Sequence, residues 1–391
     1  MTVSERDVDV IVVGGGIGGL SSALALARSG RRVRVLERAP EFAEVGAGLQ
    51  IAPNATRILR EWGVLDEVIG LGVLPRRLVF RDAVDGRELT HLPLGEEFVA
   101  RYGGPYVVIH RSDLLGVLQR ACDRAGVDLV PNCEVTDVET AQDTAVVRSA
   151  AGVQRADVAI GADGLRSRLR ARLSDDEPVN SGYVAYRGAF PVEELETEPD
   201  ERALTDVVAY IGPGCHLVQY SLRGGEMFNT VAVFRSPGFL RGEAEYGGPE
   251  ELDEVFAGAC PQVRHGLRSL WRVRHWKMFD RVPVPNWVDG RMALTGDAAH
   301  PMLQYLAQGA CQAIEDAHCL AAQAAASSGD WPVALKEYER VRTERTARVQ
   351  TSARVWGDIW HVDGVARLLR NELFLSREPG DHKHVDWLYG A

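Results

Sequence analysis

VDVIVVGGGIGG, at residues 8–19, is the stretch that decides the fold of this chain. Residues 8–13 form a short run of mostly β-branched side chains, which is typical of a buried parallel strand. Gly14, Gly16 and Gly19 then follow the spacing Gly-x-Gly-x-x-Gly. The first glycine allows a tight turn, the second lets a pyrophosphate approach the backbone, and the third lets helix and strand pack closely. The stretch therefore predicts a dinucleotide site whose phosphates face a helix N-terminus.

The residues that follow complete a strand–helix–strand unit. Residues 17–29 read as an apolar helix that ends at Gly30, and residues 33–36 as a second strand that ends at Glu37. The Glu37 carboxylate, 18 residues after Gly19, is placed to accept hydrogen bonds from ribose hydroxyls. We expect this unit to contact its cofactor through Gly14, Gly16, Ile17, Gly18, Gly19, Glu37 and Arg38.

The composition of the chain limits the classes of partner it can have. Its 391 residues suit two or three domains, and 46% hydrophobic and 25% charged residues are ordinary globular usage. A net charge of -11 argues against a nucleic-acid or anionic-membrane partner. We find no transmembrane segment and no signal peptide. The six cysteines lack Cys-x-x-Cys and zinc spacing, so we expect no metal site and interpret them as reduced thiols in a cytoplasmic protein.

The pattern of strands and helices changes after residue 181. Four strand-like segments, at 181–190, 206–211, 215–222 and 227–235, are separated partly by glycine-rich turns and read as an antiparallel sheet. A buried strand returns at 292–295, and helices follow at 309–327 and from Trp331-Pro332 onward, with the proline at the first helical position. We therefore predict an α/β fold: a Rossmann-like nucleotide-binding domain (1–180 and 286–391, with C-terminal helices) interrupted by a mixed or antiparallel substrate-binding sheet domain (181–285). Minor sheet segments near 75–110 are expected to join that second domain.

Two shorter helices and one strand are predicted between these landmarks. Residues 54–62 form an amphipathic helix with Asn54 as N-cap. Ser112 is expected to cap a second helix, which ends at Gly126. Residues 156–160 read as a strand leading into Gly161. The apolar stripe of the second helix consists of Leu114, Leu115, Leu118, Ala121 and Cys122.

Two further signatures lie downstream of the glycine loop. Residues 161–164 read GADG, and residues 296–301 read GDAAHP between a strand and a long helix. Three signatures in this order resemble those of the single-component, FAD-dependent aromatic hydroxylases, the class A flavoprotein monooxygenases. The resemblance implies that FAD is the cofactor and that NADH reduces it. The chain has no second strand–glycine-loop–helix unit for the nicotinamide, which agrees with a family in which NADH binds transiently beside the flavin.

The resemblance also implies which residues contact FAD. Asp297 matches the aspartate that binds the ribityl chain, and the helix after Gln308-Gly309 matches the one beneath the isoalloxazine, where its positive end would favour anionic reduced flavin. Asp163-Gly164, Arg111 and the loop GAGLQ (46–50) match further contacts. Taken alone, each feature also has a structural interpretation. Asp297 also fits a helix cap, and residues 161–164 an ordinary turn. Arg111 also fits a surface arginine, and residues 46–50 a surface loop. The implied contacts are Gly48, Leu49, Gln50, Arg111, Asp163, Gly164, Gly296, Asp297, Pro301, Gly309 and Ala310.

The strand at 215–222 carries the candidate substrate residues. A strand places His216, Val218 and Tyr220 on one face, with the outer two about 13 Å apart. Together they could hold a phenolic ring, since both polar groups can accept, donate or relay a phenol proton. Judged from the strand alone, the alternative is that both are core polar groups with satisfied hydrogen bonds.

The resemblance extends to the 3-hydroxybenzoate 6-hydroxylases of this family. It rests on the stretches EVGAGLQ (44–50), RYGGPY (101–106), SGYVAYRG (181–188), LRGGEM (222–227) and NWVDGR (286–291). It implies a homodimer in which His216, Tyr220 and Gln304 face a small phenolic acid. Met302 departs from the proline expected there, which leaves the identity of the substrate open.

The implied reaction hydroxylates 3-hydroxybenzoate para to its hydroxyl, giving 2,5-dihydroxybenzoate (gentisate). Dioxygen adds at flavin C4a to give a hydroperoxide, and His216 or Tyr220 removes the phenol proton so that the ring becomes more nucleophilic. The sequence assigns no partner for the substrate carboxylate, and Arg187 is only a candidate.

Three other functions remain open at this point. A salicylate 1-hydroxylase or a hydroxynicotinate hydroxylase would share the same FAD motifs and differ only in the pocket. A flavin-dependent dehydrogenase would not use oxygen productively. A redox-responsive interaction module would need an appended binding domain, which we do not find in the sequence.

Overall fold

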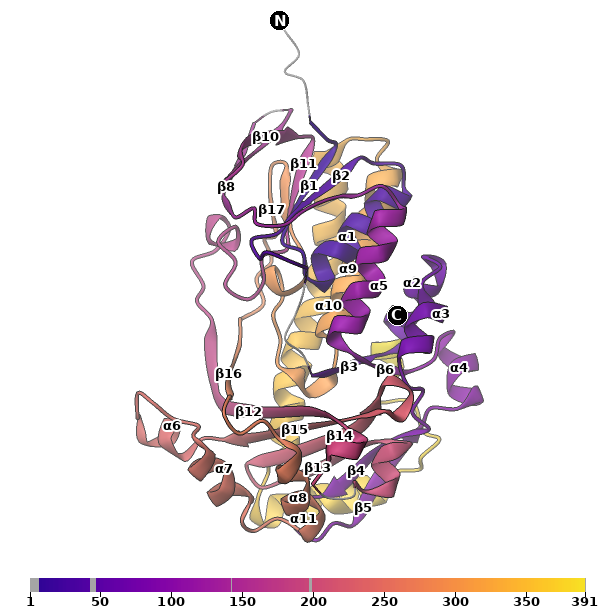
Figure 1. Ribbon diagram of the computed structural model, residues 1–391, viewed down its shortest axis with the longest axis vertical. Coiled ribbons are helices and arrows are strands. Elements are labelled where there is room, and N and C mark those ends of the chain that lie inside the picture. Colours follow the sequence, from indigo (N-terminus) through magenta and orange to yellow (C-terminus); the bar gives the residue numbers. More distant parts are fainter. Residues whose placement is uncertain (1–6, 43–46, 142, 197–198, 391) are drawn as a thin grey trace, which may run out of the picture.

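The computed structural model describes residues 7–42, 47–141, 143–196 and 199–390. Two large sheets form its upper and lower parts (Figure 1). The upper sheet has six strands in the order β17-β18-β11-β1-β2-β7, all parallel to their neighbours except β17. These strands are β1 (Val10–Val13), β2 (Val33–Leu36), β7 (Asp128–Val130), β11 (Val158–Gly161), β17 (Val288–Asp289) and β18 (Met292–Leu294).

The β1–α1–β2 unit forms as the glycine pattern predicts. Helix α1 (Ile17–Arg28) ends before Gly30, whose φ of 87° is the left-handed conformation expected of a glycine after a helix. A Cβ at Gly19 would collide with the carbonyl oxygen of Gly14, so the third glycine of the motif does allow the helix to approach the strand. Strand β1 begins at Val10, two residues later than the apolar pattern suggests.

The lower sheet has seven strands in the order β16-β12-β15-β14-β13-β4-β5. All neighbours are antiparallel except β13 and β4, so the sheet is mixed. Residues of one face, such as Tyr186, Leu217 and Phe234, form a separate apolar core against helices α7 (Pro249–Phe256) and α8 (Pro261–Gly266). The strands are β4 (Arg77–Asp82), β5 (Glu88–Pro93), β12 (Val179–Pro191), β13 (Val207–Gly212), β14 (Cys215–Leu222), β15 (Met227–Arg235) and β16 (Trp276–Asp280).

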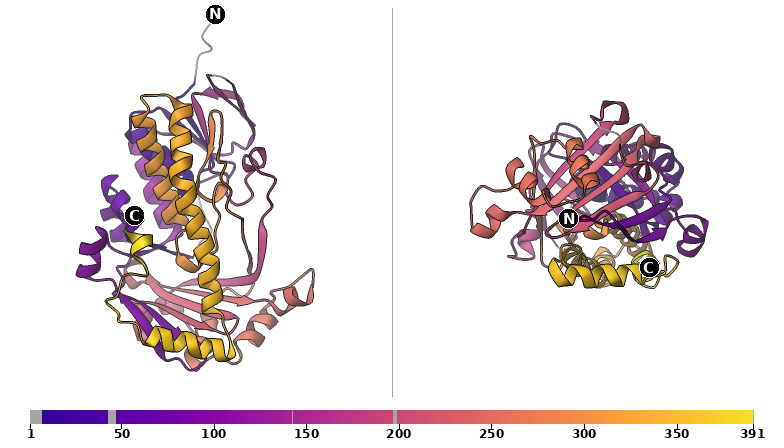
Figure 2. Two further views of the ribbon diagram at one scale, coloured as in Figure 1. Left: turned by 180° about the vertical axis from the view of Figure 1, so that it is seen from behind. Right: turned by 90° about the horizontal axis from the view of Figure 1, so that it is seen from below.

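Helices cover one side of the upper sheet, and a small sheet lies on the other (Figure 1). The covering helices are α1, α5 (Arg111–Arg124), α9 (Gly309–Ala326) and α10 (Trp331–Trp360). Helix α10, about 45 Å long at 1.5 Å per residue, runs down to the lower sheet, and α11 (Gly364–Leu375) continues beneath that sheet (Figure 2). The small sheet consists of β8 (Val135–Thr140), β9 (Ala145–Ser149) and β10 (Gly152–Ala156). The fold class predicted from the sequence is confirmed.

The remaining described elements surround these layers. Strands β3 (Gly48–Ile51) and β6 (Val107–His110) form a two-stranded sheet. Helix α12 (Asp386–Tyr389) contacts α2. The remaining α-helices are α2 (Pro53–Glu61), α3 (Leu65–Leu71), α4 (Glu96–Tyr102), α6 (Pro237–Arg241), α7 (Pro249–Phe256) and α8 (Pro261–Gly266).

Four local predictions were wrong. Asn54 does not cap α2: it lies inside the helix and its amide donates to Gln308 and Glu315. The cap of α5 is His110, whose Nδ1 accepts from the Ser112 backbone, and not Ser112 itself. Residues 48–50 form strand β3 because they pair with β6, while Gly46 lies outside the described residues. Pro332 is the second residue of α10, not the first.

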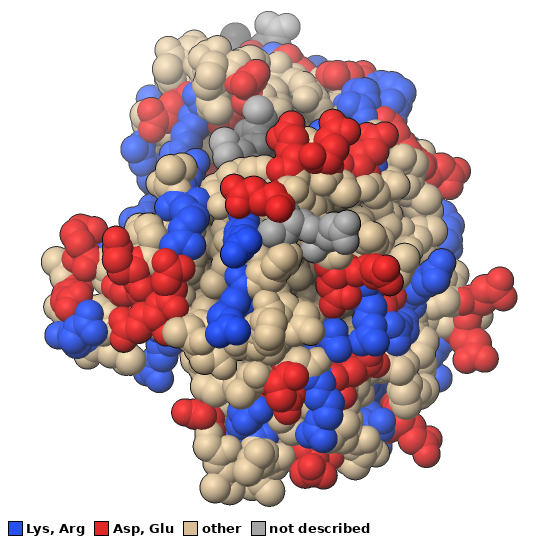
Figure 3. Space-filling model, turned by 60° about the horizontal axis from the view of Figure 1, so that its bottom comes forward, with Lys and Arg blue, Asp and Glu red and all other residues tan. Residues whose placement is uncertain are grey.

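Acidic and basic side chains are interspersed on the face drawn in Figure 3. No helix in the described ranges combines the length and apolar character needed to cross a bilayer. All six cysteines are free thiols, and no described cluster of His, Cys, Asp or Glu is arranged to hold a metal ion.

Candidate active site

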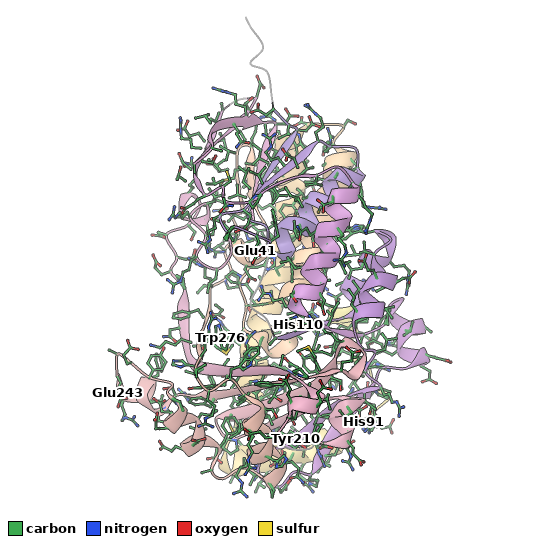
Figure 4. The ribbon with its side chains drawn as sticks, viewed as in Figure 1. Glu41, His91, His110, Tyr210, Glu243 and Trp276 are labelled. Carbon is green, nitrogen blue, oxygen red and sulfur yellow. The ribbon has the colours of Figure 1, made fainter. Side chains whose placement is uncertain are left out.

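A cavity of about 1800 Å³ extends from the glycine loop to the lower sheet. Glu41 and Trp276 both line it, and Figure 4 shows that they come from opposite sides, the upper part of the molecule and strand β16. Of the predicted cofactor contacts, all but Gly19 and Pro301 line this cavity, as do the predicted substrate residues His216, Tyr220 and Gln304. The fold therefore brings the dinucleotide motif and the strand with the predicted substrate residues to one continuous space.

At the upper end, the glycine loop is held by Glu37, the acidic residue that follows β2. The Glu37 carboxylate accepts hydrogen bonds from the backbone of Gly15 at 2.6 Å and of Ala39 at 2.8 Å. A carboxylate has further lone pairs, so these bonds leave room for a ribose hydroxyl. Gly14 has a φ of 107° and packs on Ala162, so a side chain at this position would clash.

The two aspartates of the later signatures have different surroundings. Asp297 is exposed to the cavity in a 3-10 turn (Gly296–Ala298), and its carboxylate bonds no described residue, so the helix-cap alternative does not hold. Asp163 instead accepts hydrogen bonds from Ser167, Arg168 and Leu169. Its carboxylate therefore shapes the turn that follows, while the residue still lines the cavity.

At the lower end, His216 is buried and paired with a residue distant in sequence. Its Nδ1 lies 2.8 Å from Nε2 of His361, which follows α10, and no described residue bonds its Nε2. Burial lowers the pKa of His216 well below its usual value, and His361 adds to the effect. Burial, with Arg370 and Arg235 nearby, lowers the pKa of His361 to about 3. Both imidazoles are therefore neutral at physiological pH.

Tyr220 stands four residues along the same strand and remains protonated. Burial raises the pKa of its hydroxyl far above the usual value. Its ring packs directly over Gly48, where a Cβ would lie 2.5 Å from the ring. Gly48 is thus needed for the position of Tyr220, whatever contact it makes with a cofactor.

Residues 7–353 match the family model described as "FAD binding domain". This chain belongs to that family. The 3-hydroxybenzoate 6-hydroxylase 1 of Aquipseudomonas alcaligenes is 42% identical, over 98% of this chain and 97% of that protein. The 3-amino-4-hydroxybenzoate 2-monooxygenase of Streptomyces cremeus is 36% identical, over 99% and 96%. The crystal structure of Klebsiella pneumoniae HpxO complexed with FAD and uric acid superposes with a TM-score of 0.82 at 26% identity, covering 96% and 95%. The protein is an FAD-dependent aromatic monooxygenase.

The described residues fit FAD. The glycines at 14–16 leave an open cradle at the start of α1, and the N-terminus of α9 at Gly309 and Ala310 opens on the same cavity. Asp297 offers a carboxylate with no described partner, and Nε2 of both Gln304 and Gln308 is buried without a hydrogen bond. Unsatisfied polar groups next to a large cavity are expected where a polar ligand binds. Gly19 and Pro301 do not line the cavity. Gly19 packs on Gly14, and the Pro301 carbonyl accepts a hydrogen bond from Gln350.

The sequence did not reveal the network that supports the GDAAHP turn. Asp316, on α9, is fully buried and accepts from the Gly296 backbone, from His300 and from Arg342. Burial alone would raise the pKa of Asp316, but His300 and Arg342 outweigh it and hold that pKa well below the usual value. His300 thus faces Asp316 and supports the turn. The only sequence signal was the acidic pair Glu315-Asp316 in a helix with no other acidic or basic residue except His318.

His361 was also missed. It lies 145 residues after His216 in a segment with no motif, so only the fold brings the two together. Its ring stacks on Tyr183 with centroids 4.7 Å apart, which fixes its orientation.

Proposed function

We propose that the protein uses NADH and dioxygen to hydroxylate 3-hydroxybenzoate para to its hydroxyl, giving gentisate. The observation that carries this proposal is the placement of His216 and Tyr220 on the cavity face of β14, on either side of Val218. A neutral imidazole and a protonated phenol at the two ends of an apolar floor suit a ring with two polar substituents. The 42% identical relative named for this reaction supports the same substrate.

His216 is the group that we assign to the phenol proton. A neutral imidazole can accept a proton at Nε2 if its Nδ1–H donates to His361. Tyr220, with its raised pKa, is instead a hydrogen-bond donor. Removing the phenol proton raises electron density at the positions ortho and para to the oxygen, where the new hydroxyl is introduced.

Other cavity residues orient the substrate and exclude water. Bound FAD, held by the glycine cradle and Asp297, supplies the activation of dioxygen. The Gln304 side chain lines the cavity, and we assign it a hydrogen bond to an oxygen of the substrate near the flavin. Val218, Ala209 and Leu303 give the cavity an apolar lining, which keeps bulk water from the reacting atoms.

The use of NADH, the homodimer and the cytoplasmic location are part of the proposal. Helix α11 carries exposed apolar side chains that a second subunit could cover. Light scattering during size-exclusion chromatography gives the mass of the assembly, and comparing NADH with NADPH gives the preferred reductant.

The test is the rate of NADH oxidation in air with a panel of phenolic acids. We expect 3-hydroxybenzoate to stimulate oxidation more than salicylate or 6-hydroxynicotinate, and the oxygen consumed to match the product formed. Salicylate is the main alternative substrate, because a salicylate hydroxylase structure superposes with a TM-score of 0.80 at 25% identity. Equal stimulation without product would refute hydroxylation of all three acids.

A further inference from the structure

Arg187, on β12, is a cation in the cavity wall with no anionic partner among the described residues. Its guanidinium makes no hydrogen bond or ion pair with them, and Nε is shielded from solvent without a partner. It stacks on Trp276, with Cζ 5.5 Å from the ring centroid. An unpaired charge that is partly shielded from water is costly, because it loses hydration without gaining a counter-ion. The arrangement therefore favours an anion that enters the cavity.

The strand register places Arg187 beside the predicted substrate position. Arg187 pairs with Val231 on β15, and Val231 pairs with Val218 on β14. All three line the cavity, while the alternate residues of these strands face the separate core. With neighbouring strands about 4.8 Å apart, the Cα of Arg187 is about 10 Å from that of Val218. The arginine thus flanks the apolar floor on which the ring would lie.

The electrostatic neighbours of Arg187 indicate which end of the substrate it meets. The His216 end is enclosed by the rings of His361, Tyr305 and Trp360, which carry no net charge. The charge of Arg187 acts instead on the Tyr220 hydroxyl at the other end. Burial, reinforced by repulsion from Arg111, lowers the pKa of Arg187. Arg111 also lines the cavity, so its charge adds to the positive potential around Arg187.

We propose that Arg187 binds the carboxylate of the aromatic acid, with a second hydrogen bond donated by Tyr220. The phenolic hydroxyl then lies toward His216. This assignment rests on the proposed function and deepens it, because it fixes the orientation of the ring. A guanidinium can bind a carboxylate through two parallel hydrogen bonds, so the site should select acids over neutral phenols of the same shape.

Equilibrium binding tests this assignment without turnover. The FAD-loaded enzyme is titrated in the absence of NADH with 3-hydroxybenzoate and with 3-hydroxybenzamide, a neutral ligand of nearly the same shape, and flavin absorbance is followed. The variant is Arg187→Met, which keeps an apolar stem against Trp276. The control is Arg274→Met: Arg274 stacks on the same Trp276, 4.9 Å from its centroid, but does not line the cavity.

We expect Arg187→Met to weaken binding of the acid by about 100-fold and of the amide by less than about threefold, while Arg274→Met changes neither. In the wild type, the acid should bind at least about 10-fold more tightly than the amide. That ratio remains a test if the variant does not fold.

Three results would overturn the assignment. Equal loss of acid and amide binding in Arg187→Met would show a structural role. Loss of FAD with unchanged selectivity for the acid would assign Arg187 to the flavin. Tight binding of 3-hydroxybenzoate to wild type and Arg187→Met alike would refute carboxylate binding by Arg187 and leave the proposed function standing. A wild type that binds neither ligand would refute the proposed function itself.

Discussion

Nε2 of His361 lies 2.8 Å from Nδ1 of His216, and the two rings are almost parallel, 18° apart. Two neutral imidazoles in this arrangement share one proton between these atoms. When His216 donates it, Nε2 of this cavity residue carries a lone pair and bonds no described residue. The partner of His216 therefore decides whether His216 can act as a base.

We predict that His361→Leu lowers kcat for 3-hydroxybenzoate by about 10- to 100-fold, within the usual range for acid–base catalysis. The loss follows because Nδ1–H of His216 no longer has an acceptor. His361→Gln, whose amide oxygen can accept that hydrogen bond, should retain most activity. Steady-state rates across pH 6 to 9 check this, with the surface variant His318→Leu as control. Equal rates in Leu and Gln variants would contradict it.

Gly48→Ala is predicted to weaken substrate binding by about 10-fold, because its Cβ would displace the Tyr220 ring. Gly70→Ala is the matched control, since this exposed glycine of α3 has nothing within 4 Å of an added Cβ. Titration of both FAD-loaded variants with 3-hydroxybenzoate measures the effect. An unchanged dissociation constant in Gly48→Ala would show that Tyr220 does not contact the ligand.

Asp297→Ala is predicted to release FAD without destabilising the apoprotein, because this carboxylate bonds no described residue. FAD content after dialysis and urea unfolding of the apoprotein measure the two effects separately. If FAD is retained at wild-type level, Asp297 does not bind the cofactor.

Asp316→Asn, unlike Asp297→Ala, should destabilise the apoprotein and lower its free energy of unfolding by about 3–5 kcal/mol. The change leaves His300 buried without its acidic partner and leaves Arg342 with Glu315 alone as acidic partner. Asp128→Asn removes an ion pair that is partly exposed, with Arg34, and should cost less than about 1 kcal/mol. Urea unfolding compares the two, and similar losses would argue against the buried network.

Stability should fall as the pH is lowered from about 6.5 to about 4. His216 and His361 have lowered pKa values in the folded state, so only the unfolded chain gains these protons in that range. Each histidine then contributes a slope of up to about 1.4 kcal/mol per pH unit, which is absent above pH 6.5. Urea unfolding at several pH values measures the slope. His216→Gln should reduce it, and an equal slope in that variant would contradict the account.

The sequence predicted those parts of the site that depend on local spacing. Gly14 and Glu37 belong to one strand–helix–strand unit, so their motif implies their geometry. The alternation of side chains along β14 likewise puts His216 and Tyr220 on one face, because residues four apart in a strand point the same way. Such features depend on residues close together in the chain.

The parts that were missed depend on distant contacts. His361 and Asp316 act through partners that only tertiary packing brings near, and neither lies in a recognisable motif. Asn54 was mistaken for a helix cap because its true partners, Gln308 and Glu315, are more than 250 residues away. Arg187 could be named as a candidate from the sequence, but its lack of a described protein partner is a property of the fold.

The central claim is that this cavity hydroxylates 3-hydroxybenzoate para to its hydroxyl. The most direct test is turnover of 3-hydroxybenzoate with NADH under isotopically labelled dioxygen. The product is separated by chromatography and its molecular mass is measured by mass spectrometry. We predict gentisate carrying one labelled oxygen atom, in an amount equal to the NADH consumed. NADH oxidation that yields only hydrogen peroxide, or a dihydroxybenzoate other than the 2,5-isomer, would contradict it.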